Sequence, residues 1–462
     1  MKSLRLFLSL ALVGLALAAW SGLSAYAHGH GFAEEPGQLG HYTIGHTSYM
    51  LTDASRNNRP VYLDVWYPAD SWTVNSSTPP ALYPLDPYST NLPVSKSTDW
   101  EPLGYDPAFE GIPPSRDGRF PLVMFSPGFD NDSWQQIFVG IRLASHGYVV
   151  AVLDHYADCQ WAWSPCNDFW TTLYNRPRDV SFAITSLLRM SEDRGQFLHN
   201  MIDPERIAAS GHSLGGYAAF TLAGGDDEVC DAMEEVLEGE FSLPYPPSTC
   251  VPTYPDPRVK VIVPMDGSAW ALHYRELARI EVPSLIMGEP GDNWIGLFPD
   301  GSSKDFVSRP HAAIGRPDSF RVDVMGANHY TFTNYCDGAK VFLNLGIITP
   351  DVYAQWMENW PCTSTGPSPV TVSSADGHLA VTKYTIAFLD LYLNGPDRDP
   401  PIDVWILTEK YALTHVPAVQ FFENERCKAP LPDKTYFRYR PYQTSSECDV
   451  AQKDPVGWFL SQ

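Results

Sequence analysis

Short, wholly apolar segments that alternate with helix-like stretches constrain the fold of this chain more than any other feature. The segments "FPLVMFS" (120–126) and "GYVVAVLD" (147–154) carry almost no polar residues, and residues 134–145 between them fit a helix. A sheet that faces water on one side alternates apolar and polar residues, whereas strands covered on both faces are apolar throughout. The order strand, helix, strand therefore predicts a mostly parallel central sheet with helices on both faces.

The same alternation runs through most of the chain and predicts one α/β domain over residues 28–395. The other expected elements are strands over 42–51, 60–67, 207–210, 259–265, 283–288 and 320–326, and helices over 178–190, from Leu214 onward, and over 381–394. Two Pro- and polar-rich stretches, 68–119 and 226–257, are expected to be loop insertions, the first of them a long excursion over the surface. Residues 396–462 are expected to form a C-terminal extension packed on the domain.

Residues 1–27 have the layout of a secretory signal peptide. Lys2 and Arg5 supply positive charge, residues 6–20 are apolar, and Ala25-Tyr26-Ala27 fits a small-x-small cleavage site. No later segment is apolar enough to cross a bilayer. We therefore expect a secreted protein, extracellular or periplasmic, with no integral membrane span after signal removal.

The cysteines agree with export. All eight lie beyond the expected cleavage site, and an oxidising compartment would pair an even number. They fall into couples that are near in sequence, which predicts the disulfides Cys159–Cys166, Cys230–Cys250, Cys336–Cys362 and Cys427–Cys448. No closely spaced set of Cys and His predicts a metal site.

The formal net charge of −23 limits the partners of the chain. Proteins that bind nucleic acids need basic surface to meet the phosphates, and anionic membranes repel an acidic protein. We therefore expect no nucleic-acid partner.

The motif Gly211-His212-Ser213-Leu214-Gly215 is a G-x-S-x-G that follows an apolar strand and opens a helix. A nucleophile on such a tight strand-to-helix turn needs Gly on both sides, because a Cβ would clash there. The N-terminus of the helix then directs free N–H groups at a developing oxyanion. The motif predicts an α/β-hydrolase fold with Ser213 as the nucleophile.

A serine nucleophile needs a histidine base, which in this fold follows it in the chain. His329 lies just after the strand over 320–326 and is our candidate base. Four other histidines are expected to be packing or surface residues: His212, which would pack beneath the turn, and His311, His378 and His415.

The acid of the triad has two candidates. Asp266 ends the strand over 259–265, and Asp292 follows the strand over 283–288. Both come after carboxyl ends of strands, where sites of open α/β sheets gather. Asp292 is slightly favoured, because the acid of this fold more commonly follows the later strand.

The oxyanion hole needs two backbone N–H donors. One is that of Leu214, the residue after the nucleophile, and the other comes from the loop after residues 120–126. Pro127 in that loop has no N–H, which makes Phe129 the candidate.

Several of these segments resemble those of the platelet-activating-factor acetylhydrolases and of the bacterial proteins called predicted dienelactone hydrolases. The resemblance spans roughly residues 42–395 and lies in "RPVYLDVWYPAD", "FPLVMFSPGF", "VGIRLASHGYVVAVLDH", "RPRDVSFAITSLL", "IDPERIAASGHSLGGYAAF" and "VMGANHYTFTNYC". It implies a hydrolase of small acyl esters that uses a Ser/Asp/His triad and no metal or other cofactor, with Ser213 and His329 in their roles. The resemblance implies two different positions for the acid. The acetylhydrolases have the acid where Asp266 stands, and the related polyester hydrolases and cutinases have it where Asp292 stands. The usual His-Gly of the oxyanion loop is Pro127-Gly128 here.

The leading hypothesis is a secreted serine hydrolase of short-chain acyl or lipid carboxylic esters. One alternative is a polyester or cutin-type hydrolase, with a groove for the polymer lined by some of Trp134, Trp161, Trp163, Trp170, Trp270 and Trp294. A less favoured one is an inactive binding module, since such proteins usually lose the nucleophile or the base. A true dienelactone hydrolase would carry Cys where Ser213 stands.

Overall fold

The computed structural model describes residues 35–88, 93–158, 169–226, 229, 251–269, 272, 274–289, 306–359, 362, 370–394, 404–416 and 418–423. Its strands are β1 (Thr43–Asp53), β2 (Arg59–Ala69), β3 (Leu82–Pro84), β4 (Val94–Lys96), β5 (Phe109–Glu110), β6 (Phe120–Ser126), β7 (Val149–His155), β8 (Ile202–His212), β9 (Val259–Met265), β10 (Ser284–Gly288), β11 (Ser319–Val324) and β12 (Val419–Glu423). Its α-helices are α2 (Ser97–Trp100), α3 (Ile137–Ser145), α4 (Phe169–Glu192), α5 (Leu214–Gly224), α7 (Tyr274–Leu277), α8 (Ser308–Ile314), α9 (Tyr335–Asn344), α10 (Pro350–Asn359), α11 (Ser374–Leu389) and α12 (Glu409–His415). The signal peptide expected over residues 1–27 lies outside the described residues.

The strands form one large sheet in the order β12-β11-β10-β9-β8-β6-β7-β2-β1-β5. Strands β6 to β11 are parallel to one another, while β2 runs antiparallel to both β7 and β1. The chain passes from β6 to β7 on one side and then returns to place β8 on the other side of β6. Ligand sites of open α/β sheets lie at the carboxyl ends of the strands, at such a change of direction. This is an α/β-hydrolase fold, as the sequence predicts.

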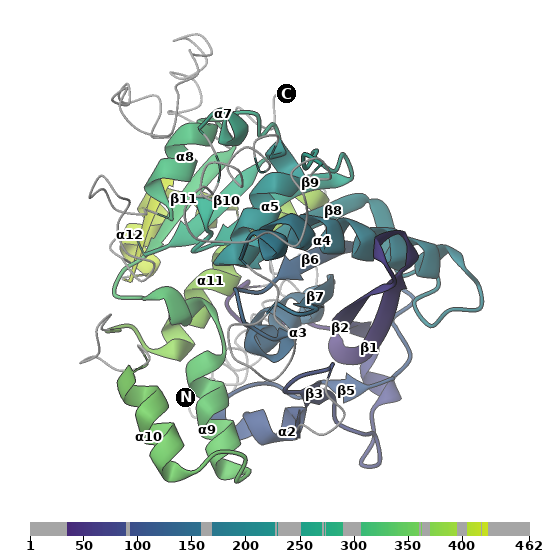
Figure 1. Cartoon of the computed structure of the whole chain (residues 1–462). Helices are drawn as coiled ribbons and strands as arrows, with labels where there is room; N and C mark the ends of the chain where they lie inside the picture. Colours follow the sequence, from purple (N-terminus) through teal and green to yellow (C-terminus); the bar gives the residue numbers. More distant parts are fainter. Residues whose placement is uncertain are drawn as a thin grey trace, which may run out of the picture.

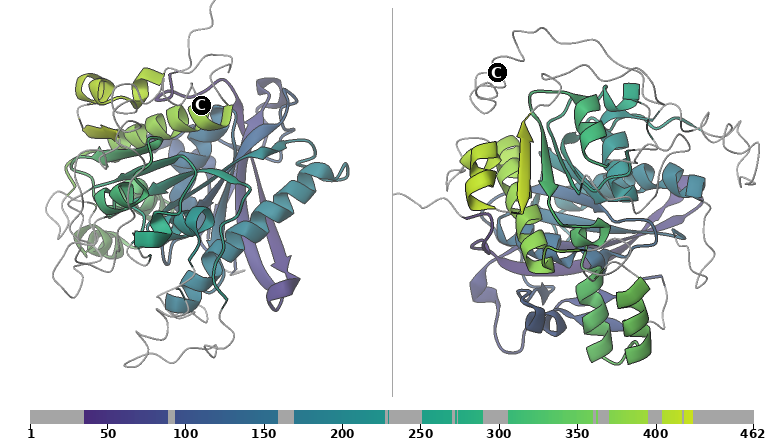
Figure 2. Two further views of the ribbon diagram at one scale, coloured as in Figure 1. Left: turned by 90° about the horizontal axis from the view of Figure 1, so that it is seen from above. Right: turned by 90° about the vertical axis from the view of Figure 1, so that its left-hand side faces the viewer.

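Helices cover both faces of the sheet (Figures 1 and 2). One core cluster joins α3, α9 and α11 to residues such as Val123 and Val150, and the other joins α4 and α5 to residues such as Leu122 and Ala151. Neighbouring residues of β6 and β7 thus point into opposite cores. Both faces are buried, which is why these strands are apolar without a break.

The stretch 68–119 is less of a surface excursion than its polar composition predicts. It contains β3, β4, α2 and β5, and the last of these pairs with β1 and so extends the sheet. Tyr83 and Trp100 within it are fully buried in the core that contains α3. These two aromatic side chains anchor part of the segment to the core, although the segment shows no clear period in its sequence.

Helix α4 begins before the position that the sequence predicts. The prediction starts at residue 178, yet the helix spans Phe169–Glu192 with Pro177 inside it. The extra turns bring Arg176 into the helix, on its buried side.

Helices α9 and α10 and the edge strand β12 are among the elements that have no counterpart in the sequence prediction. Helices α9 and α10 lie side by side at the lower left of Figure 1, and the disulfide Cys336–Cys362 links the first turn of α9 to the chain beyond α10. The other predicted disulfide partners, Cys159, Cys166, Cys230, Cys250, Cys427 and Cys448, lie outside the described residues. In the C-terminal extension, β12 pairs antiparallel with β11.

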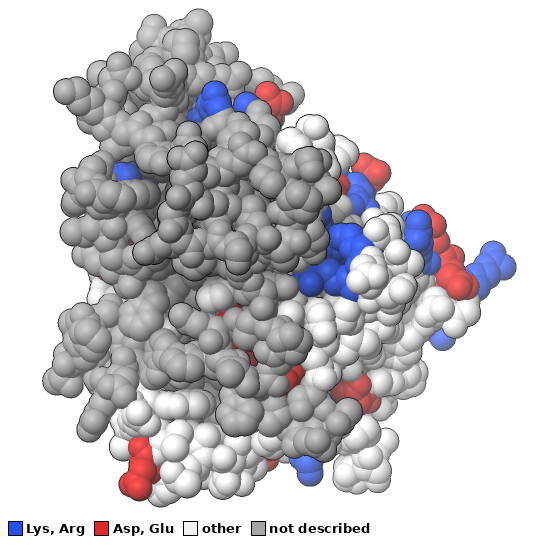
Figure 3. Space-filling view, in the orientation of Figure 1, with Lys and Arg blue, Asp and Glu red and all other residues white. Residues whose placement is uncertain are grey.

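The surface of the described part carries both signs of charge. Figure 3 shows Lys and Arg side chains gathered right of the centre, where Figure 1 draws α4, and acidic side chains scattered around them. Within the described ranges, no helix combines the length and apolarity that a bilayer crossing requires.

Candidate active site

Ser213 stands on a sharp turn between β8 and α5. Its backbone has φ 52° and ψ −119°, a conformation that is rare for a residue with a side chain and typical of a nucleophile elbow. A Cβ on Gly211 would lie 2.3 Å from the carbonyl oxygen of Gly215, and one on Gly215 would lie 1.7 Å from that of Ser126. Both glycines of the motif are therefore required by backbone packing.

His329 begins the short helical turn that follows β11. Asn328 caps this turn by accepting a hydrogen bond from the backbone N–H of Tyr330, which fixes the start of the turn. The His329 side chain is buried, and its Nδ1 lies 2.5 Å from Oδ2 of Asp266. A neutral histidine that donates from Nδ1 to a carboxylate presents a basic Nε2.

Asp266 follows the last residue of β9 and is fully buried. Its φ of 46° turns the chain sharply at the end of the strand. The neighbouring strand makes room for the carboxylate, since a Cβ on Gly288 would lie 2.5 Å from Asp266 Oδ1. Of the two candidate acids, Asp266 is thus placed against His329, while Asp292 lies outside the described residues.

His212 packs directly against the candidate base. Its ring centroid lies 4.5 Å from that of His329, and its Nε2 donates to the backbone carbonyl oxygen of His329 over 2.8 Å. Burial and the charge of His329 hold the pKa of His212 well below its ordinary value. The neutral ring of His212 therefore holds the backbone at His329 in place. The sequence does not reveal this role, because His212 and His329 are far apart in the chain.

The candidate oxyanion donors lie at the ends of two neighbouring strands. Leu214 is the first residue of α5, and Phe129 belongs to the loop that follows β6. Strands β6 and β8 pair up to Ser126 and Gly211, so the loop and the elbow lie side by side. Arg176 is a residue of this region that the sequence analysis missed: its buried guanidinium donates to the carbonyl oxygens of Pro127 and Gly128.

The other histidines and the tryptophans that the sequence analysis singled out either contact residues other than those of the site or have side chains outside the described part of the chain. His311 and His378 are buried and contact the backbone carbonyls of Ser319 and Thr333, and His415 ends α12. Trp134 is buried in the core, with its ring centroid 4.9 Å from that of Phe342. Trp170 lies in α4 with a side chain that is not described, and Trp161, Trp163, Trp270 and Trp294 lie outside the described residues.

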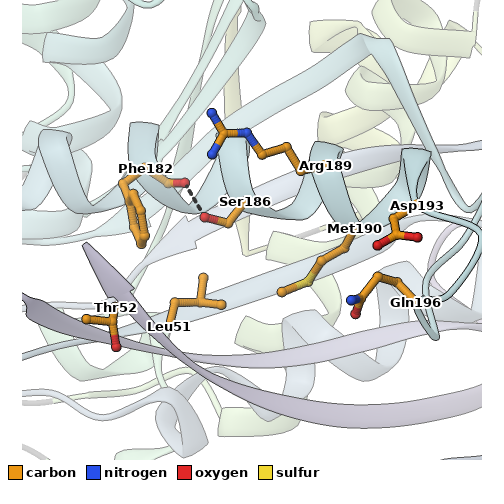
Figure 4. A pocket seen from close by; sticks show the side chains of 8 residues that line it. All are labelled: Leu51, Thr52, Phe182, Ser186, Arg189, Met190, Asp193 and Gln196. Carbon is orange, nitrogen blue, oxygen red and sulfur yellow. Dashed lines mark hydrogen bonds between the residues drawn. The ribbon is translucent and has the colours of Figure 1, made fainter. Parts of the chain in front are cut away.

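A hollow of about 310 Å³ lies between the end of β1 and the second half of α4 (Figure 4). It contains none of the site residues and is lined by Leu51, Thr52, Phe182, Ser186, Arg189, Met190, Asp193 and Gln196. Among the described residues, no three His, Cys, Asp or Glu side chains are grouped so that they could hold a metal ion.

Comparisons with known proteins find esterases. No protein-family model matches the chain. Two cutinases of Thermobifida alba, est1 and est2, are each 28% identical to it over 110 residues, which is 24% of this chain and 32% of each cutinase. Cutinase 2 of Thermobifida cellulosilytica is 27% identical over 110 residues and 37% of its length. The chain thus spans about a third of the length of the curated relatives it matches.

Among solved structures, a ferulic acid esterase from Streptomyces cinnamoneus superposes with a TM-score of 0.46 and 21% sequence identity. The match covers 82% of this chain and 96% of the esterase.

Proposed function

We propose that this chain is a serine hydrolase of carboxylic esters, with Ser213 as nucleophile, His329 as base and Asp266 as the acid. The observation that carries the proposal is the buried hydrogen bond from His329 Nδ1 to Asp266, in a fold that presents Ser213 on a strained elbow. The match to cutinases over a quarter of the chain supports the same chemistry.

In the proposed reaction, Ser213 Oγ attacks the ester carbonyl carbon and its proton passes to His329 Nε2. The N–H groups of Leu214 and Phe129 donate to the oxyanion that forms. The bond to the alcohol oxygen then breaks, and His329 returns the proton to that oxygen as the alcohol leaves. Water, deprotonated by His329, hydrolyses the acyl-enzyme and releases the carboxylic acid.

The position of the acid bears on the substrate. The acetylhydrolase-like sequence pattern has its acid where Asp266 stands, and Asp266 is the aspartate that contacts His329. We therefore propose a relationship to that family and a preference for short acyl or lipid esters. Export through the signal peptide of residues 1–27 is part of the same proposal and is supported by the disulfide Cys336–Cys362.

The test is the Ser213→Ala variant assayed on p-nitrophenyl butyrate. Removal of the nucleophile should lower kcat by at least about 10⁴-fold, because only binding and the oxyanion hole then remain. A fluorophosphonate probe should label the wild type and not the variant. A folded wild type that neither turns over the ester nor takes the label would favour the inactive binding module.

An aromatic row favours a second candidate, a polyester or cutin-type hydrolase. Tyr330, next to His329, lies 5.0 Å between ring centroids from Tyr335, which stacks on Trp356 at 5.6 Å. Tyr335 and Trp356 are half-buried, and rings of this kind can stack on an aromatic acid group. Release of products from an aromatic polyester film, compared with turnover of the soluble ester, separates the two candidates.

A further inference from the structure

Arg176 is an arginine of α4 whose guanidinium is almost wholly buried, at 1% exposed. Its Nη1 donates to the carbonyl oxygen of Pro127, and its Nη2 donates to that of Gly128 over 2.7 Å. Burial of a guanidinium costs several kcal/mol unless its hydrogen bonds and its charge are well compensated. Here the hydrogen bonds go to the loop from which the second oxyanion donor is expected.

A trans peptide group is planar, so the C=O of one residue and the N–H of the next point in opposite directions. Since Arg176 holds the carbonyl oxygen of Gly128, the N–H of Phe129 points away from the guanidinium. We propose that Arg176 is a positioning residue of the oxyanion hole, which aims the N–H of Phe129 by holding the opposite end of its peptide group. This inference rests on the ester hydrolase function proposed above.

A chain of hydrogen bonds fixes the position of Arg176 itself. Its Nη1 lies 3.2 Å from Ser126 Oγ, which lies 2.9 Å from His155 Nε2. His155 Nδ1 in turn lies 2.9 Å from Asp179 Oδ2. The chain thus joins the ends of β6 and β7 to α4.

The protonation states give every bond in this chain one direction. Burial and the charge of Arg176 lower the pKa of His155, so its ring is neutral. Asp179 is buried too, but the charge of Arg59 and the hydrogen bond from His155 outweigh burial and hold its pKa far below the ordinary value. His155 therefore donates from Nδ1 to the Asp179 carboxylate and accepts at Nε2 from the hydroxyl of Ser126. That hydroxyl can then only accept from Arg176, so no member can rotate without losing a bond.

The charge of Arg176 is balanced close by, since its Nη2 also forms an ion pair with Asp158. Paired charges contribute little net field at the reacting carbonyl compared with an unpaired cation. The structure thus assigns to Arg176 a role that depends on the direction of its donors, and replacement by lysine, a point charge without the planar fork, should not restore it fully.

The chain offers a matched control two residues further along α4. Arg178 also ties a loop to the helix, by donating to the carbonyl oxygens of Val251 and Pro252, but it does not contact residues 126–129. Replacement of Arg178 by Met therefore removes an equivalent arginine without touching the oxyanion loop.

The experiment measures kcat and KM on p-nitrophenyl butyrate for wild type, Arg176→Met, Arg176→Lys and Arg178→Met. It also measures the inhibition constant of an alkylboronic acid, which forms a tetrahedral adduct with the serine. For Arg176→Met we expect kcat to fall by about 10- to 100-fold, somewhat less than for outright loss of one oxyanion donor. Boronic acid affinity should fall by a similar factor with KM nearly unchanged, while Arg176→Lys falls between and Arg178→Met matches the wild type.

A folded Arg176→Met variant whose kcat and boronic acid affinity equal those of the wild type overturns the inference and leaves the ester hydrolase proposal intact. So does an equal loss of kcat in Arg178→Met, because the effect would then be general to the helix. If Arg176→Met does not fold, the double variant Arg176→Met, Asp158→Asn removes both charges and gives the same reading. A wild type that is inactive on every ester overturns the proposed function itself.

Discussion

Asp266 and Asp292 are the two acids that the sequence offers for the proposed triad, and a tertiary contact favours Asp266. Both follow carboxyl ends of strands, and β9 and β10 are neighbours in the sheet, so strand order alone cannot separate them. The contact that separates them is between residues far apart in the chain: His329 Nδ1 meets Asp266 Oδ2 at 2.5 Å. Gly288, at the end of β10, is part of the same arrangement, because any side chain there would displace the Asp266 carboxylate.

Replacement of Asp266 by Asn should therefore lower kcat on p-nitrophenyl butyrate by on the order of 10⁴-fold, because the amide favours the wrong tautomer of His329. The fold should survive, since Asn has nearly the same shape. Asp292→Asn is the matched control and should keep kcat within about threefold of the wild type. The reverse pattern, with the large loss in Asp292→Asn, would show that Asp292 is the acid.

The sequence is enough to propose Ser213 and His329, because the strand-to-helix context marks the serine and chain order favours a histidine that follows a late core strand. The contacts of Arg176 with the oxyanion loop and of His212 with the backbone of His329 could not be predicted from the sequence. Each acts through backbone carbonyl groups of distant segments, at Gly128 and His329, and no sequence pattern marks the recipient of such a hydrogen bond.

At the scale of elements, the central strands follow from the sequence and the added helices do not. Strands β6 and β7 lie close to where their apolar runs predict, because strands buried on both faces are apolar on both faces. Helix α9 contains Gly338, a poor helix former, at a position where a Cβ would lie 2.3 Å from the Trp134 ring. The close packing of Trp134 thus requires glycine at position 338. Because glycine disfavours a helix, the local sequence gives no sign of α9.

The disulfide Cys336–Cys362 closes the segment that contains α9 and α10, across 26 residues of sequence. Its loss should lower the free energy of unfolding by about 3 kcal/mol, mainly because the unfolded chain gains freedom. The double variant Cys336→Ser, Cys362→Ser should thus have a lower denaturation midpoint in urea and a somewhat steeper slope, because its unfolded chain is less compact. A reductant should lower the midpoint of the wild type to that of the untreated variant. It should lower it beyond that point only to the extent that other disulfides are also reduced. An unchanged midpoint would mean that the segment contributes nothing to the cooperative unit.

At the scale of the whole molecule, buried charge gathers along the side of the sheet that contains β1, β2 and β5. His46 on β1 lies between Asp64 on β2, at 3.1 Å, and Glu110 on β5, at 2.8 Å. Burial alone would lower the pKa of His46, but its hydrogen bonds to the two carboxylates outweigh this and raise the pKa to about 9. Three strands of the sheet are thus joined by one protonated side chain.

Two carboxyl groups nearby, those of half-buried Asp132 and buried Asp154, act in the same direction with pH. Burial, followed by repulsion from neighbouring carboxylates, raises the pKa of Asp132 and Asp154 well above the ordinary value. An acid with a raised pKa binds its proton more tightly in the folded state, so its contribution to stability is lost as pH rises. The stabilisation from His46 and from these two acids is therefore lost at alkaline pH. Repulsion within a chain of net charge −23 lowers the stability further.

The free energy of unfolding should therefore fall as pH rises from about 6.5, the ordinary pKa of histidine, through about 9, the pKa of His46 in the folded protein. The increase in the pKa of His46 from about 6.5 to about 9 corresponds to about 3 kcal/mol of stability, at 1.36 kcal/mol for each tenfold change in proton affinity. Urea unfolding at pH 6, 7.5 and 9 measures it, and His46→Gln should be less stable at pH 6 and lose less between pH 6 and 9. His146→Gln is the control, because the ring of His146 is about as buried as that of His46 and its Nε2 lies 2.9 Å from the backbone carbonyl oxygen of Gln38. If His46→Gln loses as much stability with pH as the wild type and the control do, then protonation of His46 does not join these strands.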